Sequence, residues 1–163
     1  MVDLKKLCVF LVEAKKSTYA AGDAAHKYAA HKIVEADTST TLSYEVGDWK
    51  YNDNYFGGEP YGGREVVFFK DAPVYMMVYY GHVDKSVDDV GAIYKILQNA
   101  LALIPEDKPF RGPSIYKQDL FVYSNTFEGQ VDNFFGEEII SSPDGKKIYR
   151  AKYFGGLVNV RHE

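Results

Sequence analysis

The segment from residue 49 to residue 83 holds the side chains whose types and spacing could carry chemistry. Half of the 14 tyrosines of the chain fall between residues 44 and 80, and two glycine pairs interrupt the same segment. In its first part, aromatic residues alternate with polar ones, which is typical of a half-buried strand. The aromatic face of that predicted strand carries Trp49, Tyr51, Asp53 and Tyr55.

Asp53 is the first candidate for a functional group, because it is a carboxylate placed among rings. Partial desolvation there would raise its pKa and suit it to proton transfer or to binding the donor groups of a ligand. A structural role is the alternative. In that case the face is exposed to solvent, or Asp53 accepts hydrogen bonds from the neighbouring glycine loop.

Glu59, Arg64, Glu65 and His82 are the other ionisable groups that a glycine loop and a hairpin could gather near Asp53. Two carboxylates and a histidine could act as general base, general acid and orienting group. The catalytic candidates are therefore Asp53, Glu65 and His82. An ordinary ion-pair cluster has the same composition, and ion pairs are commoner.

The pairing of the two strands after the glycine loop decides what Glu65 faces. If Asp71 and Ala72 form a two-residue turn, Glu65 lies opposite Val78, among apolar neighbours, and Arg64 lies opposite Tyr79. That register makes Glu65 a second candidate for a carboxylate with a perturbed pKa.

No motif in the sequence predicts a cofactor or a metal ion. The glycine-rich stretch GGEPYGG lacks the GK[ST] ending of a phosphate loop and contains no GxGxxG. The HExxH, CxxC and EF-hand spacings are absent. We expect neither a cofactor nor a metal.

Composition places the chain among globular proteins and argues against several partners. Its 163 residues, 46% hydrophobic and 26% charged, predict one domain over residues 1–163. The net charge of −4 and the scattered lysines predict no direct binding to nucleic acid. Cys8 has no partner for a disulfide, and no apolar run approaches the length of about 20 residues that spans a bilayer. We expect a cytoplasmic protein that does not enter a membrane.

Hydrophobic periodicity predicts the elements that must position these side chains. A helix begins after Asp3 and ends near Lys16, and a long helix covers residues 86–104, with Ser86 as its start. Residues 24–34 could form a further short helix. Strands are predicted at 40–46, 49–55, 65–69, 74–80, 120–124, 131–140 and 147–154. The fold class expected is α+β: a curved, mainly antiparallel sheet of about six or seven strands packed against one long helix and an N-terminal helix.

Two ten-residue stretches of the chain resemble each other. WKYNDNYFGG at residues 49–58 and KIYRAKYFGG at residues 147–156 agree at five positions, including an intact YFGG. Two related halves of the fold would explain the match. A shared local solution, in which an aromatic strand ends at a sharp bend, explains it as well.

Motifs spread over nearly the whole chain resemble a family of uncharacterised prokaryotic domains. The residues that carry the likeness are FLVEAKKSTYA at 10–20, Tyr55-Phe56-Gly57-Gly58-Glu59, Gly63-Arg64-Glu65, Pro73-Val74-Tyr75, Tyr79-Tyr80-Gly81, Arg111-Gly112-Pro113, Glu128-Gly129 and Gly155-Gly156. The resemblance implies no assigned activity. Some members are fused to a DNA-binding helix-turn-helix module, which implies a sensing or effector role for those members. No basic recognition helix precedes the first helix here, which counts against regulation of transcription in cis.

Three functions from different classes are compatible with these residues. The first is a ligand-binding or regulatory domain whose pocket is lined by Trp49, Tyr51, Asp53, Tyr55, Glu59 and Tyr79. The second is a small metal-independent enzyme that uses Asp53 or Glu65 as general base, with His82 nearby. The third is a structural protein whose aromatic strand, including Tyr51, forms the interface of a homodimer.

Overall fold

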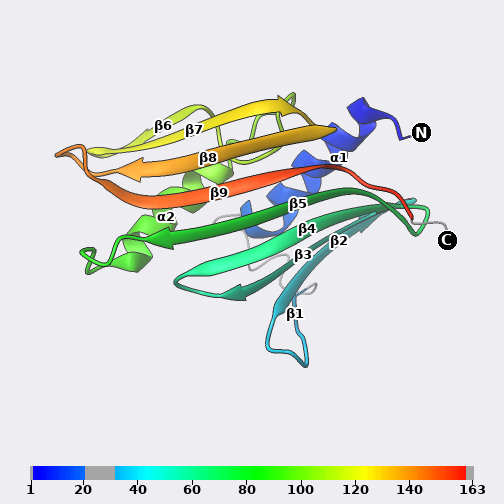
Figure 1. The fold of residues 1–163 in the computed structure, drawn as a ribbon, viewed down its shortest axis with the longest axis horizontal. Coiled ribbons are helices and arrows are strands. Elements are labelled where there is room, and N and C mark those ends of the chain that lie inside the picture. Colours follow the sequence, from blue (N-terminus) through cyan, green and yellow to red (C-terminus); the bar gives the residue numbers. More distant parts are fainter. Residues whose placement is uncertain (1, 21–31, 161–163) are drawn as a thin grey trace.

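The computed structural model describes residues 2–20 and 32–160, which form one large antiparallel sheet and two α-helices (Figure 1). The strand order in the nine-stranded sheet is β1-β2-β3-β4-β5-β9-β8-β7-β6. The helices are α1 (Leu4–Ser17) and α2 (Val90–Leu101). The strands are β1 (Lys32–Val34), β2 (Thr40–Val46), β3 (Trp49–Gly57), β4 (Tyr61–Phe69), β5 (Ala72–Val83), β6 (Ile115–Gln118), β7 (Phe121–Gln130), β8 (Asn133–Ser141) and β9 (Lys147–Leu157).

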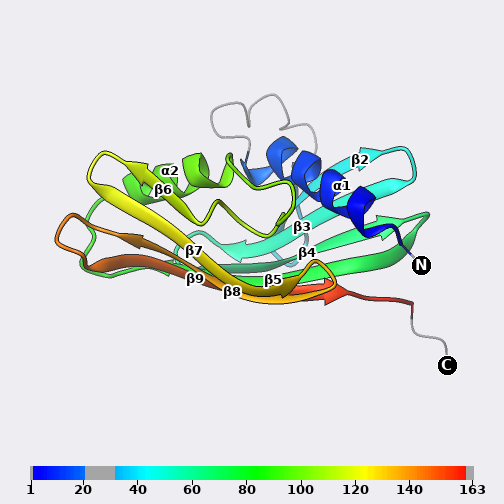
Figure 2. The same ribbon diagram turned by 90° about the horizontal axis from the view of Figure 1, so that it is seen from above.

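The chain runs twice through a similar path. A helix is followed by a meander of strands in each half, α1 before β2 to β5 and α2 before β6 to β9, and the central pair β5 and β9 joins the two meanders. Figure 2 shows both helices on the same face of the sheet. The core therefore lies on one side of the sheet, between the strands and the helices.

Two groups of buried side chains make up that core. The first core cluster packs Leu7, Phe10 and Leu11 of α1 against the sheet. The second packs Ile93, Ile96 and Leu97 of α2 against the strands of the other half. Each fully buried Leu or Ile contributes about 1.5–3 kcal/mol to stability. Tyr61 contacts both clusters, which places it at their junction.

The expected fold of six or seven strands packed against one long helix is wrong. The sheet has nine strands, and the two helices of the described chain have 14 and 12 residues. The strands β1 and β6 have only three and four residues, and no residue of either is buried, so neither carries a strong period-two signal. Residues 24–31 of the further helix considered above lie outside the described residues, and its last three form β1.

The predicted long helix is shorter than its sequence pattern indicated. Asp89, not Ser86, caps α2 and accepts a hydrogen bond from the backbone amide of Ala92 at 3.0 Å. The Ser86 amide donates instead to Asp84 at 2.9 Å. The capping residue thus stands three positions later than predicted. In contrast, the prediction that Asp3 caps the first helix is confirmed, because its side chain accepts from the amides of Lys5 and Lys6.

The turn between β4 and β5 also differs from the prediction. Lys70 and Asp71 form it, with φ of 52° and 62°, so the turn begins one residue earlier than expected. The earlier turn alone would shift each pairing by two positions, but a β-bulge between Val67 and Phe68 shifts it back by one, so Arg64 pairs with Val78 and Glu65 with Met77. No helix within the described residues is long and apolar enough to span a membrane.

Candidate ligand-binding site

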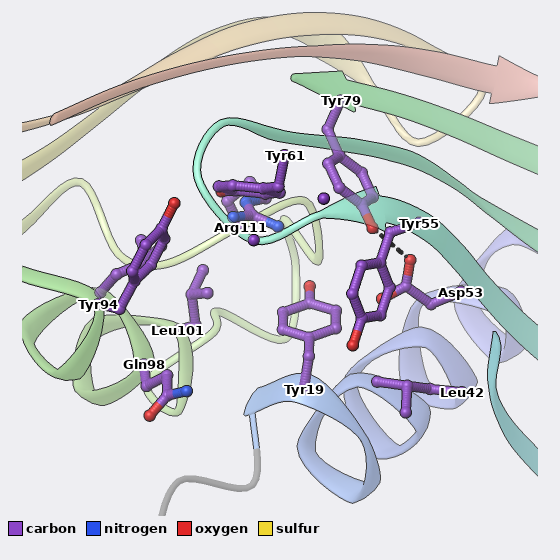
Figure 3. Close-up of a pocket in the computed structure, with 13 residues that line it drawn as sticks. Tyr19, Leu42, Asp53, Tyr55, Tyr61, Tyr79, Tyr94, Gln98, Leu101 and Arg111 are labelled. Atoms are coloured by element: carbon purple, nitrogen blue, oxygen red, sulfur yellow. Dashed lines mark hydrogen bonds between the residues drawn. The ribbon is translucent and has the colours of Figure 1, made fainter. Parts of the chain in front are cut away.

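A pocket of about 210 Å³ lies where the two halves of the molecule meet (Figure 3). Its lining comes from Tyr19 just after α1, from strands of the first half and the loop between β3 and β4, from α2, and from the segment that connects α2 to β6. Five of the lining side chains are tyrosines. The lining residues are Tyr19, Leu42, Asp53, Tyr55, Gly57, Gly58, Tyr61, Tyr79, Tyr94, Leu97, Gln98, Leu101 and Arg111.

Asp53 supplies the carboxyl group of the pocket. The side chain is 3% exposed, and its Oδ1 accepts a hydrogen bond from the Tyr79 hydroxyl at 2.6 Å (Figure 3). Gly63 makes this contact possible, because a Cβ at that position would lie 2.7 Å from the same hydroxyl oxygen. Burial raises the pKa of Asp53 to about 7, and the neighbouring Glu65 adds to the effect, while the Tyr79 hydrogen bond opposes it.

Glu65 pairs with Asp53 in the β3–β4 ladder, and Lys15 of α1 balances the charge of the Glu65 carboxylate. The Nζ of Lys15 forms an ion pair with Glu65 at 2.8 Å, and both side chains are completely buried. Lys15 also donates to the Phe110 carbonyl at 2.7 Å. Burial lowers the pKa of Lys15, and Glu65 opposes that shift. Glu65 is therefore committed to a buried pair, and Asp53 is the carboxyl that lines the pocket.

Arg111 brings a second buried ion pair to the site. Its Nε donates to Glu138 at 3.0 Å, and the hydroxyls of Tyr123 and Tyr149 donate to the same carboxylate. The guanidinium lies 5.5 Å from the ring centroid of Tyr19 and 5.6 Å from that of Tyr79. Burial acts to lower the pKa of Arg111, but Glu138 and the surrounding tyrosines together outweigh burial and raise the pKa. The charge of Arg111 is thus balanced by Glu138, which does not itself line the pocket.

Tyr61 and Tyr94 form the wall of the pocket on the α2 side. Their ring centroids lie 5.8 Å apart in an edge-to-face arrangement, and the Tyr61 hydroxyl is 2.5 Å from that of Tyr149. Glu59 fixes the loop above them, because its carboxylate accepts from the Tyr94 hydroxyl at 2.6 Å and from the Val83 amide at 2.9 Å. The loop and α2 are therefore held together at the pocket rim.

Tyr19 presents an unused polar group to the pocket. Its hydroxyl oxygen is buried and has no hydrogen-bond partner in the described structure. In Figure 3 this hydroxyl points between Arg111 and Asp53. An unpartnered buried hydroxyl is costly in free energy, so it marks a position where a bound molecule could supply the missing hydrogen bond.

Three of the six predicted ligand-binding residues line the pocket, namely Asp53, Tyr55 and Tyr79. Trp49 instead stacks on Phe10 of α1, with ring centroids 5.3 Å apart. Tyr51 is completely buried in the first core cluster. Glu59 holds Tyr94 but does not line the pocket. Period-two alternation correctly placed Trp49, Tyr51, Asp53 and Tyr55 on one face of β3. Helix α1 covers the first half of that face, so only Asp53 and Tyr55 reach the pocket.

The structure does not bring the three catalytic candidates together. Asp53 and Glu65 face each other, but His82 is exposed and lies beside Tyr80, with ring centroids 6.4 Å apart. Residues of β5 alternate between buried and exposed from Tyr79 to Val83, so His82 points to the opposite face of the sheet from Tyr79. It cannot orient a group at Asp53.

Sequence reasoning missed Tyr19, Tyr61, Tyr94 and Arg111 as pocket residues. Each comes from a different segment, so no local pattern connects them. Arg111 offered the best signal, since it stands between Phe110 and Gly112-Pro113 in a proline-rich connection, and an arginine that is buried there needs a charged partner.

The arrangement suits recognition of a small molecule by rings and one carboxyl group. It also offers a proton donor or acceptor near neutral pH, because the pKa of Asp53 is about 7. Among the described residues, no group of three or more His, Cys, Asp or Glu side chains could hold a metal ion.

Comparison with known proteins identifies a family but no activity. A family model described as a domain of unknown function (DUF5680) matches residues 53–158, which is more than half of the chain. The match begins at Asp53 and includes β4, β5, α2 and the Arg111 segment. No curated protein and no solved structure matches the chain.

Proposed function

This chain belongs to the DUF5680 family, and from that premise we propose that it is a small-molecule-binding or regulatory domain whose ligand occupies the pocket around Asp53. The observation that carries the proposal is a pocket with five tyrosines, a buried carboxyl group and the unpartnered hydroxyl of Tyr19. Its volume of about 210 Å³ lies below the 300–1,000 Å³ of sites for drug-sized ligands, so the ligand is small.

Gly58 offers a way to test the pocket without disturbing the fold. It lines the pocket, and a Cβ added there would meet no atom within 4 Å. Gly58→Trp should therefore fill the cavity while the sheet stays intact. Tyr80→Trp is the matched control, because Tyr80 is 57% exposed on the opposite face of the sheet.

The experiment combines native mass spectrometry of freshly purified protein with thermal-shift screening of a small-metabolite library. Wild type and Tyr80→Trp should retain the same bound mass or the same library hits, and Gly58→Trp should lose them. Hits that stabilise Gly58→Trp as strongly as wild type would show that binding occurs elsewhere and would refute the proposal.

A second candidate function is catalysis by Asp53 in the same pocket. One observation favours it, namely a pKa of about 7, at which a carboxyl group can both take up and release a proton. Glu65 is less suited as general base because it is fully buried against Lys15. An enzyme of this kind would show a rate that changes around pH 7 and that Asp53→Asn abolishes.

A further inference from the structure

The balance of buried charges around the pocket is negative. Among the described residues, the buried acidic and basic side chains are those of two basic residues, Lys15 and Arg111, and three acidic residues, Asp53, Glu65 and Glu138. Lys15 pairs with Glu65, and Arg111 pairs with Glu138. Asp53 is left over. The hydrogen bond to Asp53 comes from a neutral phenol, Tyr79, and Lys15 and Arg111 are each paired with another carboxylate, so Asp53 has no ion-pair partner of its own among the described residues.

The walls of the pocket are suited to a positive charge as well. Tyrosine rings carry negative potential on their faces, and several rings around one carboxylate are a known way to hold an organic cation. The molecule already uses this contact once, where the Arg111 guanidinium lies over the rings of Tyr19 and Tyr79. Tyr55 stands beside Asp53, away from Arg111, which leaves that end of the pocket for a second cation (Figure 3).

Hydrogen bonding points to the same chemistry. An ammonium group has three donors and no acceptor. Asp53 provides carboxylate oxygens, and the unpartnered oxygen of Tyr19 provides a further acceptor. The other end of the pocket is formed by Leu97, Leu101 and the ring of Tyr94, which suits an apolar group.

We propose that the ligand is a small organic cation, a protonated amine that carries one apolar group of about the size of a ring. This inference rests on the proposed function and names its ligand class. The ammonium group pairs with Asp53, and the apolar group lies against Leu101 and Tyr61. A cavity of 150 Å³ holds benzene, so a pocket of about 210 Å³ accommodates a ring with one amine-bearing carbon.

Three probes of nearly equal shape separate charge from size, namely benzylamine, benzyl alcohol and benzoate. Isothermal titration calorimetry at pH 7 should show that wild type binds benzylamine at least about tenfold more tightly than benzyl alcohol, and benzoate least tightly. Binding of the amine should release protons to the buffer, because a cation beside Asp53 favours its charged form. Titration in two buffers with different ionisation enthalpies measures that release.

Two aspartate variants complete the test. Asp53→Asn should lose the preference for benzylamine and the proton release, while it still binds benzyl alcohol. Asp71→Asn removes the same charge from the exposed turn between β4 and β5 and should behave as wild type. Equal binding of alcohol and amine by wild type would overturn the cation inference and leave the pocket in place. Failure of all three probes to bind would overturn the ligand class proposed here, whereas the binding function itself is decided by the comparison of wild type with Gly58→Trp.

Discussion

At the residue scale, the burial of Asp53 makes the stability of the fold depend on pH. The folded-state pKa of Asp53 is about 7, whereas an aspartate in an unfolded chain titrates near 3.9. The unfolded chain therefore releases this proton at a lower pH than the folded protein does. Raising the pH from about 4 to about 7 favours the unfolded state, because only that state accommodates the charged carboxylate without cost. The groups that face Asp53 are Glu65 of β4, Tyr79 of β5, Arg111, and Lys15 and Tyr19 of the N-terminal segment.

Asp53→Asn should remove this pH-dependent loss of stability. A shift of about three pKa units corresponds to at most about 4 kcal/mol, since each unit is 1.36 kcal/mol. We expect the free energy of unfolding of the variant to exceed that of wild type by a few kcal/mol at pH 8. The two proteins should approach each other at pH 4. Urea unfolding at a series of pH values measures the difference curve, with Asp71→Asn as the control. A constant difference across this range would contradict the raised pKa.

At the scale of elements, the two copies of YFGG, at residues 55–58 and 153–156, have the same sequence but different structural surroundings. The first copy lies in β3 and the second in β9, which is at the centre of the sheet, so the two strands do not hold equivalent positions. The glycines differ as well. Gly57 has φ of 78°, whereas Gly155 and Gly156 belong to an extended strand. The repetition of α-helix and meander in the fold therefore does not underlie the match between residues 49–58 and 147–156.

Alanine at the last glycine of each copy should separate the two roles. A Cβ at Gly58 meets no atom, so Gly58→Ala should change the free energy of unfolding by less than about 0.5 kcal/mol. A Cβ at Gly156 would lie 2.3 Å from the Asp132 carbonyl oxygen, and Gly156→Ala should destabilise the protein by about 1–3 kcal/mol. Urea unfolding of both variants tests the contrast. Equal effects would mean that the two glycines are equivalent after all.

Local patterns predicted elements better than they predicted how elements meet. Alternation located β2, β3 and β9 to within a few residues. The cap at Asp3 was also predictable, because an aspartate just before a helix can accept hydrogen bonds from the amides two and three residues later, here those of Lys5 and Lys6. The turn at Lys70 and Asp71 was missed by one residue because a non-glycine residue with positive φ leaves little trace in sequence. The short edge strands β1 and β6 were missed because they bury no side chain.

At the scale of the whole molecule, the pocket exists because side chains from the two halves of the chain meet on the helix-covered face of the sheet (Figure 2). Asp53, Tyr55 and Tyr79 were predictable since they share one face of β3 and β5, the two strands that flank β4. Tyr94 lies in α2, and Arg111 lies in the connection after α2, whose position depends on buried ion pairs between distant segments such as that of Arg111 with Glu138. Such pairs have no periodic signature. The sequence therefore pointed to the segment that contains part of the candidate site, but among its lining residues only Asp53, Tyr55 and Tyr79 of β3 and β5 could be specified.

The connection between α2 and β6 ties the two halves into one unit, and this determines how the protein should unfold. Phe110 packs in the first core cluster and its carbonyl binds Lys15, while the adjacent Arg111 pairs with Glu138 of the second meander. The central strands β5 and β9 are also hydrogen-bonded on both sides, whereas β1 and β6 are paired on one side only. Native-state hydrogen exchange should show the slowest amides in β5 and β9, fast exchange in β1 and β6, and one common opening free energy for β3, β4, β7 and β8. Two distinct opening energies, one for each meander, would show that the halves unfold separately.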